Sequence, residues 1–448
     1  MSISQNFPNT RPSLNLNFAR SKTLDPRITF SRTSTGTYVD ESGFIRDAVA
    51  DEPRFDHDPV TGECLGLLVE ESRVNNYHKW NSTTDTATNL SSAFIDTQTV
   101  SSVLTPRGVT ATAYTATKTG NSSQYHGLNS GANNFSISAN TSVSASAYIK
   151  DFNNSDYRLY FVIAAYNAST NNYRYILYRA RPSTGEWIAG AVHSNWSTPV
   201  TDVKDVGNGW YRFEISATNT YAAGWNVIQF SFQLLNESNA QFYDPPTANT
   251  HGLYLSSPQF ELGNFPTSYM PTNNDSNGSR TPDSVSMEGD NFSDWYNPSE
   301  GAISITCSTY TDGSDYINAL TLSDGSLVDL NNTLEIALTS STTNTKVGRL
   351  TVRTNGSTPV DVGAVGVIAN LQSNKKYKMM VSYEKDDFAF SVDGVTYFTS
   401  ESGDLPLNIS KLSIGHRRSN LAMLFGHISQ LTYYPVRLPN STLQTLTK

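Results

Sequence analysis

The stretch VGNGWYRFEIS, residues 206–216, combines a tight turn with the start of a strand. Its Gly-Asn-Gly sequence allows the positive φ angles that a tight turn needs, so we expect a strand to begin at or just after Trp210. Alternate side chains of a strand point to opposite faces, which puts Tyr211, Phe213 and Ile215 together on an apolar face. Trp210 shares the other face with polar residues, so a ligand-binding platform stays open as an alternative. We predict instead that Trp210 lies in the core or at its edge, because tryptophan is heavily buried on average and the pleat is often irregular beside a turn.

Similar short alternating runs, separated by turn residues, fill most of the remaining chain. Five of them lie between residues 143 and 236, and a second set extends from GAISITCSTY, residues 301–310, to GHISQLTYYPV, residues 426–436. Helical periodicity is nearly absent outside the final LPNSTLQTLTK, residues 438–448. The pattern predicts an all-β protein, in which an amino-terminal hairpin-rich extended segment is followed by two antiparallel β-sandwich (jelly-roll) domains.

Changes in composition indicate the domain boundaries. The stretch PTNNDSNGSRTPDSV, residues 271–285, is rich in Asn, Ser, Gly and Pro and has almost no apolar residues, which is typical of an interdomain linker. The predicted parts are an amino-terminal segment, a first sandwich, a linker and a second sandwich, over residues 1–76, 77–272, 273–285 and 286–448 respectively.

Two hairpins are expected within the amino-terminal segment. Their turns lie at Glu41-Ser42-Gly43 and at Thr61-Gly62. Because isolated hairpins bury little surface, we expect this segment to need a partner surface before it becomes ordered.

Composition also limits the classes of function. The 448 residues carry a formal net charge of −9, and only 16% of them are charged. A nucleic-acid-binding protein needs a basic stripe, which is missing, so no nucleic-acid partner is expected. The sequence has no apolar run of about 18 residues and no signal-peptide core, so we expect no membrane insertion and a soluble chain that is made in a cytoplasm. The two cysteines, Cys64 and Cys307, are expected to be free thiols.

Three stretches resemble parts of phage virion structural proteins. In residues 11–76, an F-x-R-x-[ST]-x-[AG]-T-Y hairpin precedes P-R-F-D and a G-L-L-[VI]-E-E-x-R-x-N ending, a combination similar to the amino-terminal module of phage tail-fibre proteins. The matching residues are Phe30, Arg32, Ser34, Gly36, Thr37, Tyr38, Pro53, Arg54, Phe55, Asp56, Gly66, Leu67, Leu68, Glu70, Glu71, Arg73 and Asn75. This resemblance implies that the segment attaches the protein to the virion, through residues such as Phe30, Arg32, Tyr38, Arg54, Phe55, Glu70 and Arg73.

The other two stretches resemble sandwich domains. VGNGWYRFEIS, together with SSPQFELGNFPTSYMPT at residues 256–272, is similar to the closing strands of a carbohydrate-binding-module-like jelly roll. YKMMVSYEKDDFAFSVDG, residues 377–394, together with residues 426–446, is similar to the last strands of a concanavalin A-like, laminin-G-like sandwich. Such domains imply carbohydrate binding.

Catalytic and metal-binding motifs are missing from the sequence. The E-x-D-x-x-E spacing of sandwich glucanases does not occur, and neither does a G-x-S-x-G nucleophile elbow, so we expect no enzymatic activity. No zinc motif is present among the seven histidines, and we expect no cofactor. The loops TDGSDY, residues 311–316, and NNDSNG, residues 273–278, leave Ca²⁺ binding open as a weaker alternative to ordinary solvated loops.

Sugar recognition favours exposed aromatic rings beside Asn, Asp and Arg. Four aromatic residues lie in or beside turn-like sequence of the first sandwich, and each is either a contact residue or an ordinary loop aromatic. These candidates are Trp187, Trp196, Tyr221 and Trp225.

Together these observations predict a non-enzymatic, tail-fibre-like virion protein of a bacteriophage, assembled in the cytoplasm of the bacterial host. The amino-terminal segment would join it to tail or capsid proteins, and the sandwiches would bind host surface polysaccharide. Such fibres are usually homotrimers. The alternative is a purely structural capsid decoration, head-fibre or cement protein without a glycan ligand.

Overall fold

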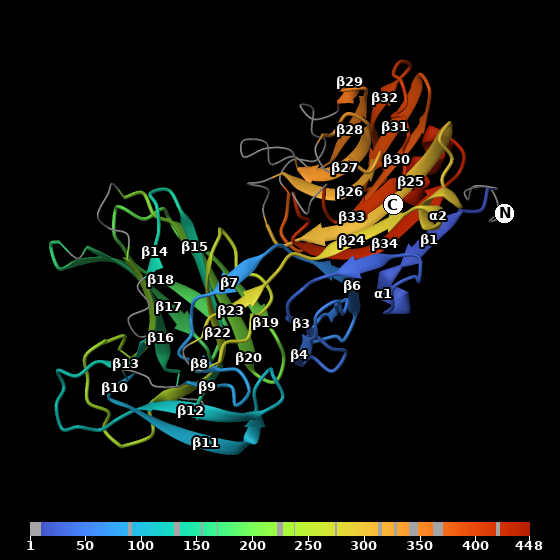
Figure 1. The fold of residues 1–448 in the computed structure, drawn as a ribbon. Coiled ribbons are helices and arrows are strands. Elements are labelled where there is room, and N and C mark those ends of the chain that lie inside the picture. The colour runs from blue at the N-terminus through green and yellow to red at the C-terminus, as the bar shows by residue number, and fades with distance from the viewer. Residues whose placement is uncertain are drawn as a thin grey trace.

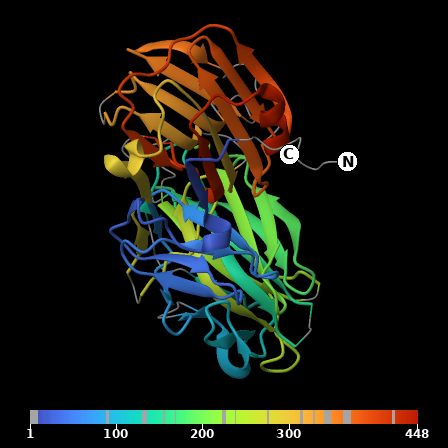
Figure 2. The same ribbon diagram turned by 90° about the vertical axis from the view of Figure 1, so that its right-hand side faces the viewer.

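The computed structural model describes residues 10–448 except 88–91, 130–134, 154–155, 168, 222–226, 237, 274–275, 312–315, 327–328, 340–347, 362–370 and 418–421. Strands make up 52% of the chain and helices 4%, which confirms the all-β prediction. Figure 1 shows a middle sandwich at the left and a C-terminal sandwich at the upper right, with the amino-terminal strands beside and between them. Figure 2 gives the same arrangement turned by a quarter turn.

The middle sandwich consists of two antiparallel sheets that enclose one apolar core. The first sheet contains β10 (Ser92–Ala93), β13 (His126–Asn129), β14 (Phe135–Ser136), β16 (Arg158–Asn167), β17 (Asn172–Arg181), β18 (Glu186–Val192) and β21 (Val227–Leu235). The second has the order β11 (Ile95–Leu104), β12 (Thr110–Ala116), β22 (Gly252–Leu262), β15 (Ser142–Asp151), β20 (Trp210–Thr218) and β19 (Val200–Asp205). A small hairpin, β8 (Trp80–Asn81) with β9 (Thr86–Ala87), precedes them.

The turn-and-strand stretch behaves as the alternation predicts. Strand β20 begins at Trp210, directly after a turn in which Asn208 has a φ of 54° between two glycines of positive φ. Phe213 and Ile215 lie in the core between the two sheets. Trp210, only 2% exposed, lies in a separate apolar cluster with Tyr254 and with Ile45 of the amino-terminal segment. Its indole N–H donates to the Leu104 carbonyl at 3.0 Å. The predicted core-edge position of Trp210 is confirmed.

The C-terminal sandwich also has two sheets, and strands of the amino-terminal segment belong to both. One sheet contains β1 (Leu14–Asn17), β5 (Phe55–His57), β6 (Cys64–Val69), β25 (Glu300–Thr309), β30 (Tyr377–Glu384), β31 (Asp387–Val392), β32 (Val395–Ser400) and β34 (Gly426–Tyr434). The other contains β2 (Thr29–Ser31), β24 (Ser284–Glu288), β26 (Ile317–Ser323), β27 (Thr333–Thr339), β28 (Arg349–Thr354), β29 (Ser357–Asp361) and β33 (Lys411–Ile414).

In the described residues, helices are confined to three short elements, α1 (Phe18–Ser21), α2 (Asp290–Ser293) and α3 (Asn440–Leu446). The last of them is the helix expected near the end of the chain. No helix within the described ranges has the length and apolar character to span a membrane. Cys64 and Cys307 are free and buried, as expected.

Both amino-terminal hairpins are present, and the partner surfaces they need belong to this chain: the first hairpin packs against the middle sandwich, and the second joins the C-terminal sandwich. Strand β3 (Gly36–Val39) pairs with β4 (Ile45–Ala48), and β5 pairs with β6. Strand β1 pairs with β34, so that Leu14 lies opposite Tyr433, and β6 pairs with the same strand β34. Strand β2 pairs with β24 in the opposite sheet. Strands β1, β2, β5 and β6 are therefore an integral part of the C-terminal sandwich.

Residues 273–285 are only partly exposed, which differs from the expectation of a solvated linker: Asn273, Ser276, Asn277 and Ser279 are exposed, but the end of the stretch is buried. Strand β23 (Gly278–Arg280) pairs with β7 (Arg73–Asn75), and β24 begins at Ser284. The side chains of Arg280 and Asp283 are fully buried. At Arg280 and Asp283 the polar side chains form ion pairs with the amino-terminal segment, so their polarity does not indicate solvent exposure. The two loops that left Ca²⁺ binding open each fall partly outside the described residues.

Candidate functional site

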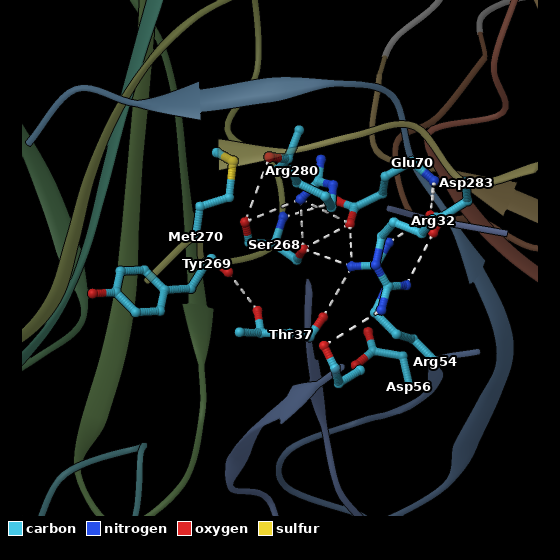
Figure 3. Close-up of polar contacts among 12 residues, drawn as sticks. Arg32, Thr37, Arg54, Asp56, Glu70, Ser268, Tyr269, Met270, Arg280 and Asp283 are labelled. Carbon is cyan, nitrogen blue, oxygen red and sulfur yellow. Dashed lines mark hydrogen bonds and ion pairs between the residues drawn. The ribbon is translucent and has the colours of Figure 1, made fainter. Parts of the chain in front are cut away.

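A buried cluster of charged residues lies where the amino-terminal segment meets residues 268–283, and we call it the junction network (Figure 3). Arg54 donates to Glu70 Oε2 at 2.7 Å and to Asp283 Oδ2 at 2.6 Å. Arg32 donates to Asp283 Oδ1 at 3.1 Å, and Arg280 lies 3.1 Å from Glu70 Oε2. All five side chains have no solvent exposure. Each carboxylate is thus shared between two guanidinium groups.

Backbone and hydroxyl groups complete the junction network. Ser268 donates to Glu70 through its backbone N–H at 2.8 Å and through its hydroxyl at 2.6 Å. Arg54 also donates to the Thr37 carbonyl at 3.0 Å, and the Thr37 hydroxyl donates to the Tyr269 carbonyl at 2.6 Å (Figure 3). These bonds fix the first hairpin against the chain that leaves the middle sandwich.

Burial and charge act in opposite directions on the pKa values of the network. Burial alone would raise the pKa of Glu70, but the charges of Arg280 and Arg54 and the bonds from Ser268 hold it well below its usual range. Burial would lower the pKa of Arg54, but Asp283 and Glu70 outweigh it and raise that pKa. Glu70 therefore stays ionised in the folded chain, and its contacts with Arg54 and Arg280 are ion pairs.

The predicted attachment residues are used mainly inside the molecule. Arg32, Arg54 and Glu70 are fully buried, so they have no surface with which to contact a particle. Phe30 and Phe55 are partly buried against the core of the C-terminal sandwich.

The remaining two attachment residues are only partly accessible. Arg73 lies over the Phe265 ring at 5.1 Å, and Tyr38 is half-buried. The expectation of direct particle contact is thus corrected for the three charged residues, because their partners lie within this chain.

The turn-region aromatics also differ from expectation. Trp196 and Tyr221 are buried and meet edge to face at 5.6 Å, where they close one end of the middle core. Trp187 is half-buried, packs against Phe161 and Phe213, and donates its indole N–H to the Asp202 carbonyl at 2.9 Å. These three rings therefore offer little or no free face for a sugar, because they fill the space between the sheets. Trp225 lies outside the described residues.

Exposed aromatic side chains do gather on the outer face of the middle-sandwich sheet that contains β16, β17 and β21. Tyr173 and Tyr175 of β17 are 49% and 43% exposed. Tyr173 lies opposite Tyr166 of β16, and their ring centroids are 4.8 Å apart. Tyr175 lies opposite Ala164, a small residue that leaves the neighbouring ring uncovered. We call this surface of β16, β17 and β21 the tyrosine face.

Polar groups extend the tyrosine face toward the other end of the same strands. Tyr160 lies opposite Arg179 on one side and Gln233 on the other. Residues directly opposite one another in adjacent strands point to the same side of a sheet, so these three belong with the tyrosines. The face combines aromatic rings with amide and guanidinium donors at the spacing of neighbouring strands.

Asp156, two residues before β16, already has hydrogen-bond partners. Asp156 accepts from Arg181 Nε at 2.7 Å and from the Ser183 hydroxyl at 2.5 Å. These hydrogen bonds, led by the one from Arg181, lower the pKa of Asp156 to about 2. In the part of the chain that the structure describes, no three His, Cys, Asp or Glu side chains gather to hold a metal ion.

Comparisons with known proteins give weak similarities. No family model matches the chain, and no curated protein matches it. The Ruminococcus gnavus IT-sialidase CBM40 bound to alpha2,3 sialyllactose has a TM-score of 0.28 and 14% identity, with 34% of this chain and 84% of that chain covered. The LG1-3 region of the laminin alpha2 chain has a TM-score of 0.23 and 11% identity, with 67% and 63% covered. A Trypanosoma rangeli sialidase in complex with the inhibitor DANA has a TM-score of 0.26 and 10% identity, with 75% and 60% covered.

TM-scores this low carry no argument about function. The functional interpretation therefore depends on the residues of this chain.

Sequence reasoning missed the tyrosine face because it searched turns for binding residues. The run NYRYILYRAR, residues 172–181, carries tyrosines on both strand faces, since Tyr173 and Tyr175 share one parity and Tyr178 has the other. Only the burial of Ile176 and Ala180 identifies the inner face and leaves the first two tyrosines outside. The alternation of tyrosines was visible in the sequence, but the sequence did not show which of the two strand faces packs against the second sheet.

Proposed function

We propose that this protein is a non-enzymatic glycan-binding protein whose binding surface is the tyrosine face. The observation that carries the proposal is the pair of exposed rings, Tyr173 and Tyr175, on a regular and fully paired strand. Exposed tyrosine presents a flat apolar surface and a hydroxyl at its tip, which suits the C–H face and hydroxyl groups of a sugar. A rigid strand keeps the rings at a fixed spacing, so little conformational entropy is lost on binding.

The polar end of the face supplies hydrogen-bonding groups for specificity. The Arg179 NH2 group donates to the Ala189 carbonyl at 2.8 Å, which fixes the direction of the guanidinium. Gln233 accepts from Gln241 at 2.6 Å, so its amide is also oriented. Oriented donors and acceptors select among sugars that differ only in hydroxyl geometry, because a mismatched hydroxyl leaves a polar group unpaired.

The proposal extends to a virion. The resemblance of residues 11–76 to phage fibre modules supports a tail-fibre-like protein that binds host polysaccharide and assembles as a homotrimer. In Figure 1 the sheet that carries the tyrosine face lies at the left, on the side away from the C-terminal sandwich. In this proposal, particle contacts use the accessible surface of the amino-terminal segment and of the sandwich into which it is built. Localisation of the protein on particles by electron microscopy, and its molar mass by light scattering, test these two points.

A glycan array probed with the full chain tests the binding function. We expect a subset of bacterial surface polysaccharides to bind, and we expect Tyr173→Ala combined with Tyr175→Ala to remove that binding. Tyr173→Phe combined with Tyr175→Phe keeps the rings and is expected to retain most of it. Phe242→Ala, at an aromatic residue that is 55% exposed and outside the face, is the matched control.

Unchanged binding by the double alanine variant would contradict the tyrosine face. A chain that binds no glycan at all would favour the alternative of a decoration or cement protein. Release of reducing sugar from a bound polysaccharide would contradict the non-enzymatic part of the proposal.

A further inference from the structure

Acidic residues are missing from the three strands that carry the tyrosine face. Strands β16, β17 and β21 have the sequences RLYFVIAAYN, NYRYILYRAR and VIQFSFQLL, and none of them contains Asp or Glu. The chain as a whole has 40 acidic residues and a net charge of −9. Strands of the opposite sheet of the same sandwich do carry acidic residues, such as Asp151, Glu214 and Glu261. The tyrosine face is therefore a local exception in an acidic protein.

Two of the guanidinium groups at the polar end of this face already have carboxylate partners. Arg181 of β17 lies 2.7 Å from Asp156 and 3.5 Å from Glu186. Arg158 of β16 lies 3.9 Å from the same Asp156. Two cations and two carboxylates compensate one another, so this group attracts a further anion only weakly.

Arg179, on the same side of β17, has no such compensation. Among the described residues no carboxylate lies within ion-pair distance of it, and its one hydrogen bond runs from NH2 to the Ala189 carbonyl at 2.8 Å. The side chain is half-buried, and of its unbonded nitrogens only Nε is a buried atom. NH1 and the second N–H of NH2 are therefore open to a ligand, on a guanidinium that stays charged at all physiological pH values.

An aromatic ring lies beside this free cation. Tyr160 of β16 is directly opposite Arg179. Side chains in opposed positions point to the same side of the sheet and have Cβ atoms about 4.5–5.5 Å apart. A sugar ring that lies on Tyr160 thus brings a carboxylate attached directly to that ring within reach of the guanidinium. A phosphate group is joined to the ring through an additional oxygen and extends further, so it fits this short spacing less well.

We propose that the tyrosine face selects acidic polysaccharides, and that Arg179 binds the carboxylate of a uronic acid residue. The inference rests on the proposed glycan-binding function and adds the chemical class of the ligand. Tyr175 lies four residues from Arg179 on the same strand, about 13 Å away at about 3.3 Å per residue. In this arrangement the exposed rings of Tyr173 and Tyr175 hold sugars further along the same polysaccharide chain.

The negative charge of the whole protein does not prevent this binding. At physiological salt the Debye length is about 8 Å, so exposed charges further away are largely screened. Asp156 and Glu186 are already paired with Arg181. Guanidinium–carboxylate bonds are about twice as strong as bonds between neutral groups, so the local pairing at Arg179 outweighs the screened field of distant carboxylates.

A matched pair of ligands tests the inference on the unaltered full chain. Each polysaccharide that binds on the glycan array is compared with its carboxyl-reduced form, in which every uronic acid has become the corresponding neutral hexose. We expect the polysaccharides that bind to contain uronic acid, and we expect carboxyl reduction to weaken binding about tenfold or more, equivalent to about 1.4 kcal/mol. An increase in NaCl from about 0.05 M to about 0.5 M should weaken binding of the acidic form and leave the reduced form nearly unchanged.

Substitutions then locate the carboxylate on the protein. Arg179→Gln should weaken binding of the acidic form about tenfold and change binding of the reduced form by less than about twofold. Arg179→Lys, which keeps the charge without the fork, should give an intermediate affinity. Lys385→Gln removes one exposed cation of the C-terminal sandwich and is the matched control, which should bind like the parent chain. Because the ligand comparison needs no substitution, it remains decisive if Arg179→Gln does not fold.

The inference is overturned if the polysaccharides that bind are neutral or carry only phosphate, or if carboxyl reduction leaves binding unchanged. It is also overturned if Arg179→Gln weakens binding of the acidic and reduced forms equally, since Arg179 would then not contact the carboxylate. In each of these cases a glycan still binds, so the proposed function stands. If no polysaccharide binds, or if the double tyrosine-to-alanine variant binds like the parent chain, the proposed function fails and the inference fails with it.

Discussion

The amino-terminal segment and the middle sandwich are both made of short strands, but they obtain their stability in different ways. The middle sandwich encloses its own core between two sheets, with Phe161 and Phe213 buried at its centre. The amino-terminal segment has no core of its own, since Leu14 and Leu67 belong to the core of the C-terminal sandwich. One region is therefore stabilised by contacts close in sequence, and the other by contacts with the far end of the chain.

The junction network shows a further difference between the amino-terminal segment and the middle sandwich. Apolar burial is non-directional, whereas five buried charges demand particular partners in particular places. Apolar contacts stabilise the middle sandwich, and ion pairs specify where the amino-terminal segment attaches. The two regions should accordingly respond differently to deletion, to charge removal and to acid.

Deletion of residues 1–76 should have the largest effect. It removes β1, β5 and β6 from one sheet of the C-terminal sandwich and β2 from the other, and leaves β34 as an exposed edge strand. We expect the chain 77–448 to lose cooperative unfolding of the C-terminal sandwich and to aggregate, while far-UV and near-UV circular dichroism still detect the middle sandwich. A soluble 77–448 chain that melts in two cooperative steps would show that the segment is only an appendage.

Among single substitutions, Arg54→Met should be the most damaging. It leaves Glu70 and Asp283 with one fewer cation each in a site without solvent, and breaking one side of a buried ion pair typically costs about 3–5 kcal/mol. Chemical unfolding of the full chain provides the measurement. Arg46→Met, which removes a partly exposed ion pair to Asp40, is the control and should cost less than about 1 kcal/mol. Equal effects of the two variants would contradict a special role for the network.

Acid should weaken the junction before it affects the middle core. The pKa of Glu70 is lower in the folded chain than its ordinary value of 4.5, so the contribution of this group is fully present above about pH 4.5. As the pH falls further, the unfolded chain takes up the proton first and the contribution is progressively lost. Unfolding free energies measured from about pH 6 to pH 3 should therefore decrease, and Glu70→Gln should remove part of that dependence. Identical pH profiles for the two proteins would contradict it.

Trp210→Phe should have the smallest effect of these changes. It tests a contact that the two regions share. Trp210 lies between the outer face of the middle sheet and Ile45 of the amino-terminal segment. The substitution removes the bond to the Leu104 carbonyl and some packed volume, and we expect a loss of about 1–2 kcal/mol in chemical unfolding. An unchanged unfolding curve would mean that this shared cluster contributes nothing to either region.

Local sequence patterns predicted the strands and their faces but not the long-range partners. The parity of Phe213 and Trp210 follows from a period of two, and the Ser42-Gly43 turn follows from the backbone freedom of glycine. Nothing near Leu14 indicates that its partner is Tyr433, because strand pairing leaves no local signal at that separation.

The burial of the charged residues was not predicted for a different reason. Arg and Asp are almost never fully buried unless they are paired, and the pairing of Arg32 with Asp283 becomes visible only when both positions are known. The sequence therefore did not predict that Arg280 and Asp283 of the linker stretch, or Arg32, Arg54 and Glu70 of the amino-terminal segment, are buried. The sequence analysis looked for binding residues in turns, so it did not select Tyr173, whose exposure depends on which strand face packs against the second sheet.

The pairing of β1 with β34 also sets the order of events during synthesis. At about 5–20 residues per second, the ribosome needs about 20–80 s to pass from Leu14 to its partner Tyr433. The middle sandwich can close during that interval, while Leu14, Leu16 and Phe18 wait without the sheet that will cover them. Translation speed and chaperone access thus decide how long this apolar stretch is open to aggregation. Strand β1, the first to be synthesised, is paired only when β34 has emerged.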